Sequence, residues 1–274
     1  MQSLVTVVTV CFNSERTIAK TIESVLEQEC TDFEYLIIDG GSKDRTIEII
    51  KEYESAFKGK LRWISEKDNG WYDAMNKGIH LSKGRFINFL NSDDYFASDA
   101  IKLVCDYIRS NSVQDDEIIY GDSTNIYRDS KGKKYYKLIQ APNVVNFSDN
   151  ALKNGMCGIR HQSMFTGRSV FKKIGDLNLK YRLHADWDFL VKCVKNGVKM
   201  YHINKNLTFY SMYGASTNPN YIERHMLRKD NGLYKGCDLY YLKDRWGLKV
   251  LMKKILGEQR WNDLLFRIHE MRGK

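Results

Sequence analysis

The sequence predicts an α/β fold with a mostly parallel central sheet flanked by helices. Short apolar runs alternate with helical patterns along the first 110 residues, and each helical pattern is about a dozen residues long. Strands separated by helices of this length form βαβ units with parallel pairing. The chain has 274 residues, of which 43% are hydrophobic, so it can form one large domain with a smaller appendage.

Each predicted element has its own local signal. The strands are continuous apolar runs of four to eight residues. The first helix carries Ile18, Ile22 and Val25 on one face, and Ser42 is expected to cap the second helix. In order, the elements are strand 4–11, helix 17–28, strand 35–38, a helix after Ser42, strand 61–65, helix 71–81 and strand 86–90.

The net charge of +9 is unevenly distributed. The first hundred residues mix both signs, whereas residues 131–137 and 243–274 are basic with interleaved aromatic residues. Such segments suit an anionic membrane surface at least as well as a phosphate backbone. We therefore expect no nucleic-acid partner, and peripheral membrane contact is one of two alternatives for the tail.

The location and redox state follow from what the sequence lacks. No apolar run approaches the ~20 residues that span a bilayer, and the N-terminus has neither a basic segment nor a cleavage site. We expect a cytoplasmic protein, peripheral at the inner face of the membrane. No CxxC pair is present, so we expect reduced thiols, mostly in the core. The six cysteines are Cys11, Cys30, Cys105, Cys157, Cys193 and Cys237.

Acidic residues follow three successive predicted strands. Asp39 ends the second strand, Asp68 follows the third, and Asp93 and Asp94 follow the fourth. Any one of them could be a turn or helix-cap residue. The carboxyl ends of parallel strands meet at one edge of a sheet, where ligands bind. Together the acids therefore predict a polar site at that edge.

The turn after the first strand limits the ways in which the protein could bind a phosphate group. It reads "TVCFNSERTI" and contains no glycine, which excludes a P-loop and a dinucleotide-binding turn. A diphosphate would still need neutralising, and a divalent cation held by Asp94 is the natural substitute. Asp39 could instead accept hydrogen bonds from a base or a ribose.

Four segments, in this order and spacing, resemble the inverting family 2 glycosyltransferases, which have the GT-A fold. The similarity covers residues 3–110 strongly and continues more loosely to about residue 215. It implies a GT-A domain at 1–215, with a nucleotide-binding half at about 1–110 and an acceptor half at about 111–215. A basic amphipathic helical tail would follow at 216–274. The segments are "VVTVCFNSERTIAKTIESVLEQ", "EYLIIDGGSKDRT", "SEKDNGWYDAMNKGI" and "GRFINFLNSDDYF".

The resemblance implies a UDP-sugar donor. By matched position Asp39 contacts the uracil or its ribose, and Asp94 ligates Mn²⁺ or Mg²⁺ through the diphosphate. Asn91 stands where many members carry aspartate, which predicts a modest metal affinity. The implied donor-binding residues are Thr9, Asp39, Asp68, Asn76 and Asp93, the last near the ribose and the metal.

Inverting transfer needs a carboxylate that takes the proton of the acceptor hydroxyl. In "KKIGDLNLKYRLHADWDFLVKCVKNG", Asp186 matches the base of the family, and Ala185 stands where many relatives have glutamate. Asp188 is the competing candidate. A helix over residues 187–194 would place Asp186 at its positive N-terminal end, which stabilises the ionised form. A simple capping role is the alternative.

Three further segments have two readings each. In similar proteins His161 and Gln162 of "GIRHQSMFTG" lie near the acceptor, although a lone histidine is more often a structural hydrogen-bonding residue. Residues 210–220 form either a loop over the diphosphate or a plain surface loop. The tail stripe either packs on the domain or docks on a membrane. It consists of Trp246, Leu248, Leu251, Ile255, Trp261, Leu265 and Ile268.

The leading hypothesis is a metal-dependent inverting glycosyltransferase that extends a lipid-linked saccharide in bacterial surface polysaccharide synthesis, such as that of O-antigen or capsule. A Mg²⁺-dependent nucleotidyltransferase is the second, although its usual glycine-rich basic loop is missing here. The third is a non-enzymatic basic module that binds RNA.

Overall fold

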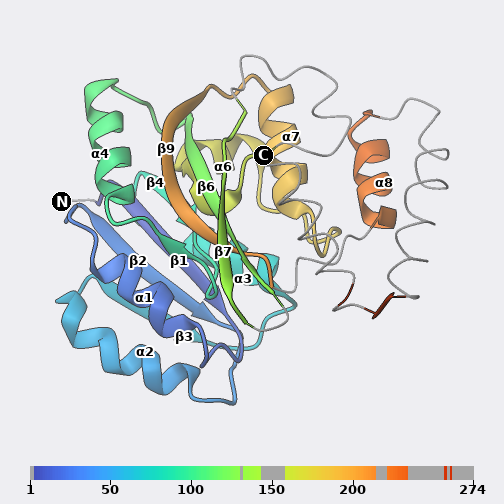
Figure 1. The fold of residues 1–274 in the computed structure, drawn as a ribbon. Coiled ribbons are helices and arrows are strands. Elements are labelled where there is room, and N and C mark those ends of the chain that lie inside the picture. The colour runs from blue at the N-terminus through green and yellow to red at the C-terminus, as the bar shows by residue number, and fades with distance from the viewer. Residues whose placement is uncertain are drawn as a thin grey trace.

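The structure is a computed structural model that describes residues 3–129, 132–142, 158–213, 221–233, 256–257 and 260. The strands of its N-terminal half are parallel, as the alternation of strands and helices predicts, and their order is β3-β2-β1-β4 (Figure 1). These strands are β1 (Val5–Cys11), β2 (Phe33–Asp39), β3 (Leu61–Ser65) and β4 (Phe86–Phe89).

The second half continues the same sheet with mixed pairing. Beyond β4 the order is β8-β6-β9-β5, and β7 pairs with β6 off this path. The β6–β9 pair is parallel, whereas the other pairs of this half are antiparallel. The predicted fold class is confirmed. These strands are β5 (Tyr95–Phe96), β6 (Ile118–Arg128), β7 (Lys134–Ile139), β8 (Met164–Gly167) and β9 (Met200–Ser211).

Helices cover both faces because alternate strand residues point to opposite sides. In β1, Val5 and Val7 face the core under α1 (Ile18–Leu26), whereas Val8 and Val10 face the core under α3 (Trp71–Leu81). Each fully buried valine or leucine contributes roughly 1.5–3 kcal/mol. The other helices are α2 (Thr46–Glu54), η1 (Ser55–Phe57), α4 (Ala100–Ser110), η3 (His161–Ser163), α6 (Arg168–Ile174), α7 (Ala185–Lys195) and α8 (Tyr221–Asp230).

The start of α2 differs from the prediction. The expected cap, Ser42, lies before the helix and donates its hydroxyl to Asp39, while the helix begins at Thr46 after Arg45. The side chain of Asp44 accepts hydrogen bonds from the backbone N–H and the hydroxyl of Thr46, at 3.0 and 2.6 Å. The capping prediction for Ser42 was therefore wrong by one turn. The hydroxyl of Ser42 binds Asp39 and is not at the start of the helix.

Helix α8 packs against the domain that carries α7. Leu227 is fully buried in the same apolar core as Phe189 and Leu190. Asn231 donates a hydrogen bond of 2.7 Å to Asp188 in α7. The predicted tail stripe lies outside the described residues, as does most of the loop at 210–220.

The described cysteines are free thiols, as predicted. Cys11, Cys105 and Cys193 are buried, and Cys30 is partly exposed, with its sulfur 3.2 Å from that of Cys105. Cys157 and Cys237 lie outside the described residues.

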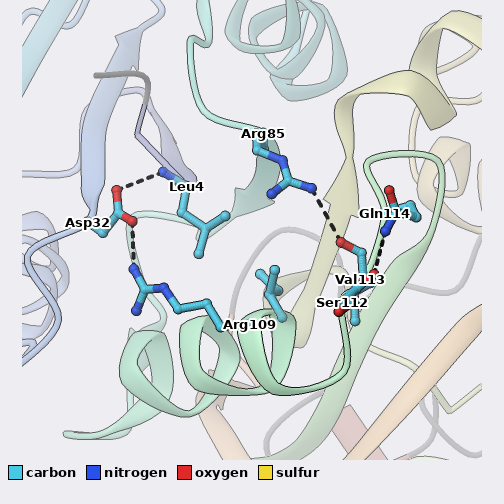
Figure 2. A pocket seen from close by; sticks show the side chains of 8 residues that line it. Leu4, Asp32, Arg85, Arg109, Ser112, Val113 and Gln114 are labelled. Atoms are coloured by element: carbon cyan, nitrogen blue, oxygen red, sulfur yellow. Dashed lines mark hydrogen bonds and ion pairs between the residues drawn. The ribbon is translucent and has the colours of Figure 1, made fainter.

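The two ends of the sheet have different surroundings. At the carboxyl ends, Cys11, Asp39 and Ser65 are register partners, so three successive strands end side by side. At the amino ends lies a cavity of about 550 Å³, in which Arg109 bonds Asp32 at 2.7 Å (Figure 2). The predicted acids lie at the carboxyl edge, away from this cavity.

Candidate active site

Asp39 lies at the centre of the carboxyl edge, but it is fully buried. Its Oδ2 accepts hydrogen bonds from the N–H groups of Gly41 and Ser42 and from the hydroxyl of Ser65, at 3.0, 2.9 and 2.6 Å. Its Oδ1 accepts from the hydroxyl of Ser42 and from Cys11. Five donors saturate a carboxylate, so Asp39 holds the loop between β2 and α2 together.

Two other predicted donor-binding side chains are also engaged within the protein. Thr9 is fully buried, and its hydroxyl accepts a hydrogen bond of 3.0 Å from Tyr35. Asn76 pairs with the backbone of Leu177, donating to the carbonyl and accepting from the N–H at 2.9 Å each. The structure therefore does not bring the side chains of Thr9 and Asn76 to the open edge.

Asp68 has an available carboxylate oxygen on the open edge. Its Oδ1 accepts from Gly70 N–H at 2.9 Å, while Oδ2 has no hydrogen-bond partner among the described residues. A Cβ at Gly40 would lie 2.6 Å from that oxygen and 3.4 Å from the ring of Phe12. Phe12 is 60% exposed. Sequence reasoning overlooked Phe12, although an aromatic residue directly after β1 was a usable signal.

Asp94 is buried behind the turn that follows β4. Its Oδ1 accepts from Ser211 N–H at 2.7 Å, and its Oδ2 accepts from the amide of Gln162 at 2.8 Å. Burial, and then the charge of Asp93, raise the pKa of Asp94 well above its ordinary value. Gln162, expected on the acceptor side, thus donates its side-chain amide to this acid, and its place near the acceptor stays a prediction.

Asp93 is the more accessible member of the pair. It is partly exposed, and burial raises its pKa. Two adjacent carboxylates with raised pKa values are stabilised as anions by a divalent cation. The described residues include no cluster of three or more metal-ligating side chains. A Mn²⁺ or Mg²⁺ ion bound here would therefore have to take most of its ligands from outside these side chains, such as substrate phosphates.

Asp186 is the second residue of α7. Its Oδ1 accepts from the hydroxyl of Tyr72 at 2.7 Å and from Trp187 N–H at 2.9 Å, and its Oδ2 pairs with His161 Nδ1 at 2.9 Å. Burial acts to raise the pKa of Asp186, but the hydrogen bond and charge of His161, with Tyr72, outweigh it and lower the pKa to about 2. The carboxylate is ionised, and its side chain is 31% exposed.

Asp188 has a different environment. Its side chain is 2% exposed and forms an ion pair of 2.6 Å with Lys192. Its other oxygen accepts from Asn231 in the loop after α8. Among these two carboxylates, Asp186 is therefore the more accessible, since its side chain is 31% exposed.

His161 and Gln162 connect the two acidic centres. His161 bonds Asp186, and the adjacent Gln162 bonds Asp94. The amide of Asn88 in β4 donates to the carbonyls of Gln162 and Met164, at 2.8 and 2.9 Å. The sheet therefore fixes the backbone of this dipeptide.

The geometry combines an ionised carboxylate, an acidic pair and an exposed aromatic ring along one sheet edge. A sequence model described as Glycosyl transferase family 2 matches residues 6–175. The chain belongs to this family. It is a glycosyltransferase with a GT-A type fold, as the sequence segments predicted.

Curated relatives of this family 2 glycosyltransferase include a PGL/p-HBAD biosynthesis glycosyltransferase of Mycobacterium bovis. It is 28% identical over 257 residues, which is 92% of this chain and 88% of the relative. The chondroitin synthase of Escherichia coli is 29% identical over 228 residues, covering 83% of this chain but only 31% of that protein.

Solved structures share the fold. Residues 1–349 of TarS from S. aureus, in complex with UDP-GlcNAc, superpose with a TM-score of 0.65 at 16% identity, covering 84% of this chain and 66% of that chain. A mannosyltransferase from Pyrobaculum calidifontis, in complex with GDP-Man and Mn²⁺, gives a TM-score of 0.57 at 14% identity, covering 84% and 62%. This family 2 glycosyltransferase thus spans less than two thirds of each of these two solved chains.

Within the part of the chain that the structure describes, no helix combines the length and the apolar character needed to cross a bilayer.

Proposed function

We propose that this glycosyltransferase moves a sugar from a UDP-sugar to an acceptor hydroxyl with inversion of the anomeric centre. The observation that carries the proposal is the Asp186 carboxylate. It is ionised, partly exposed and joined through His161 and Gln162 to the acidic pair after β4. A proton acceptor held at a fixed place beside a diphosphate-binding edge is what inverting transfer requires.

The donor base is assigned to the open edge beside Phe12. An exposed aromatic ring offers a stacking surface, and the available oxygen of Asp68 can accept a hydrogen bond from a base N–H or a ribose hydroxyl. UDP is favoured by the UDP-GlcNAc complex of TarS. The GDP-Man complex of the archaeal neighbour makes GDP the nucleotide to compare in a binding experiment.

The metal contact is assigned first to Asp93. Both oxygens of Asp94 already accept hydrogen bonds, whereas the side chain of Asp93 is partly exposed and makes no hydrogen bond to another described side chain. A bound divalent cation would neutralise the diphosphate leaving group. The assignment of Asp94 as the direct ligand stays a prediction, and Asp94 otherwise supports the turn that carries Asp93.

In the transfer step, the acceptor oxygen forms a bond to the anomeric carbon while the bond from that carbon to the diphosphate breaks. Asp186 takes the acceptor proton. The hydroxyl of Tyr72 and the ring of His161 keep the carboxylate oriented. His161 is therefore proposed as a positioning residue, because its Nδ1 contacts the base.

The proposed acceptor is a lipid-linked saccharide of a bacterial surface polysaccharide, such as O-antigen or capsule, at the cytoplasmic face of the membrane. The names of the curated relatives, which concern PGL/p-HBAD and chondroitin synthesis, support a role in glycan assembly. The basic segments at 131–137 and 243–274 suit an anionic surface.

The decisive experiment compares Asp186→Asn with Asp188→Asn. UDP release from a panel of UDP-sugars should fall by about 10² to 10⁴ in Asp186→Asn, because asparagine keeps the shape but takes no proton. UDP affinity should stay near that of wild type. Loss of activity in Asp188→Asn alone, with an unchanged melting temperature, would move the base to Asp188.

Calorimetric titration of UDP, with and without Mn²⁺, tests the metal site. We expect Asp93→Asn to abolish the gain in UDP affinity that Mn²⁺ provides. Asp94→Asn should reduce it less, and GDP serves as the comparison nucleotide. If Asp94→Asn loses the whole gain and Asp93→Asn keeps it, then Asp94 is the direct ligand.

A further inference from the structure

The edge strand β7 exposes large apolar side chains. It pairs with β6 and with no other described strand. Alternation along the strand places Lys134, Tyr136 and Leu138 on one face, and Tyr136 and Leu138 are 56% and 51% exposed. Exposed apolar residues on an edge strand promote association unless something covers them.

An aromatic layer continues this face toward α1. The ring of Tyr136 packs edge-on against Phe209, with centroids 6.3 Å apart, and Phe209 stacks on Tyr95 at 4.8 Å. The ammonium of Lys20 lies 3.4 Å from the centroid of the Tyr95 ring. One continuous surface therefore joins β7, β9, β5 and the first turn of α1. We call this surface the β7 face; it consists of Lys134, Tyr136, Leu138, Phe209, Tyr95 and Lys20.

Three cations converge on the β7 face. Arg128 and Lys134 are direct partners in the antiparallel register of β6 and β7, an arrangement in which like charges are destabilising. Burial, and then the charges of Lys134 and Arg128, lower the pKa of Lys20. None of the ion pairs among the described residues includes Lys20, Arg128 or Lys134. An anion outside the protein would relieve this repulsion.

The β7 face adjoins the donor edge. Tyr95 directly follows Asp94, and Thr21, the neighbour of Lys20, donates its hydroxyl to the carbonyl of Asp94 at 2.7 Å. Whatever binds the β7 face therefore lies beside the site of transfer.

We propose that the β7 face docks on an anionic lipid bilayer. Tyrosine is enriched at the membrane–water interface, and an exposed leucine can insert at the boundary between the headgroups and the acyl chains. The three cations match anionic headgroups. A soluble polyanion would use the cations but would leave Leu138 without a contact. This proposal rests on the proposed function in one respect, because a lipid-linked acceptor would explain why the enzyme docks on a membrane through this surface.

The experiment is vesicle flotation of the full chain, without donor or metal. Vesicles of phosphatidylcholine mixed with phosphatidylglycerol are compared with vesicles of phosphatidylcholine alone. Each basic residue near an anionic surface contributes about fivefold in affinity, so the triple variant Lys20→Gln, Arg128→Gln, Lys134→Gln should bind mixed vesicles at least about tenfold more weakly. Tyr136→Ser with Leu138→Ser should also weaken binding.

Matched controls separate this face from bulk charge. The triple variant Lys58→Gln, Lys102→Gln, Lys199→Gln removes the same charge from other exposed positions, and Leu179→Ser removes a leucine that is also 51% exposed. Both controls should bind vesicles within about twofold of wild type.

Three results would overturn the proposal. The first is wild-type binding by the Lys20, Arg128, Lys134 variant, and the second is an equal loss in its charge-matched control. The third is that the wild-type protein binds a single-stranded oligonucleotide, and loses this binding in the Lys20, Arg128, Lys134 variant, but does not bind mixed vesicles. UDP titration of the same variants tests the donor site separately, so a failure of the proposed function is recognised independently.

Discussion

At the scale of single residues, the carboxyl edge of the sheet divides its acids into two kinds. The carboxylate oxygens of Asp39 and Asp94 accept hydrogen bonds from groups of the protein itself. Asp68 retains an available oxygen, and Asp93 is partly exposed. The sequence predicts four acids at this edge, but it does not reveal which oxygens are already occupied. The donors to Asp39 include groups at the ends of neighbouring strands, and those to Asp94 lie 68 and 117 residues later in the chain.

Gly40→Ala should weaken UDP binding without unfolding the protein. A Cβ at this position would lie 2.6 Å from Asp68 Oδ2 and would displace the carboxylate. We expect about a fivefold loss of affinity by calorimetry, the value of one hydrogen bond of about 1 kcal/mol. The double variant Gly40→Ala, Asp68→Ala should bind as weakly as Asp68→Ala alone. An additive loss would show that Gly40 acts elsewhere.

Asp186 should make stability depend on pH. Its pKa is lowered from 3.8 to about 2 in the folded protein, so its ionised form stabilises the native state. This contribution, about 1 to 2 kcal/mol after allowance for partial exposure, is complete above about pH 4 and is lost as pH falls toward 2. Urea unfolding should therefore show a difference between wild type and Asp186→Asn that is constant from pH 5 to 7 and shrinks in acid. A difference that grows in acid would contradict the assignment.

At the scale of elements, helix α3 is fastened to the segment between α6 and α7. The amide of Asn76 makes both hydrogen bonds to Leu177, which lies 101 residues later in the chain. The resemblance to the family implied a nucleotide contact for this residue. The actual partner is a backbone group brought near by tertiary folding, and no local pattern encodes it.

Asn76→Ala should therefore lower stability and leave the donor site intact. Losing two hydrogen bonds to a partly buried backbone should reduce the free energy of unfolding by about 2 kcal/mol. UDP affinity, measured at a temperature where the variant is folded, should equal that of wild type. A loss of UDP affinity at unchanged stability would restore Asn76 to the donor-binding set.

The parallel strands of the first half were predictable because each is a local apolar run and the first three are each followed by a helix before the next strand. The order in the second half was not predictable. Strand β8 lies between β4 and β6 although it follows both in sequence. That order depends on long-range antiparallel pairing, which periodicity along the chain does not report.

At the scale of the whole molecule, hydrogen bonds cross the boundary that the sequence predicts at residue 215. Leu183 N–H donates to Glu223 in α8 at 2.7 Å, and Asp230 accepts from the hydroxyl of Tyr181 at 2.5 Å. Helix α8 thus supports the segment that leads to Asp186. We propose that the catalytic domain includes at least residues up to 233.

Two truncations test this boundary. A chain ending at residue 215 exposes the core that Leu227 and Leu233 cover, at a loss of about 4 kcal/mol, and should show a lower melting temperature and weaker UDP binding. A chain ending at residue 233 should keep wild-type UDP affinity. Equal melting temperatures for the two fragments would place the boundary at 215.

The adjacent residues His161 and Gln162 set the spacing between two acidic residues, Asp186 and Asp94. The peptide bonds of the described residues are trans, and a trans peptide fixes neighbouring Cα atoms 3.8 Å apart. One residue holds Asp186 and the next holds Asp94, so covalent geometry, more than adjustable packing, sets the spacing of the two acidic centres. A change in a loop elsewhere in the molecule can therefore alter what binds at the sheet edge without altering the spacing of Asp94 and Asp186.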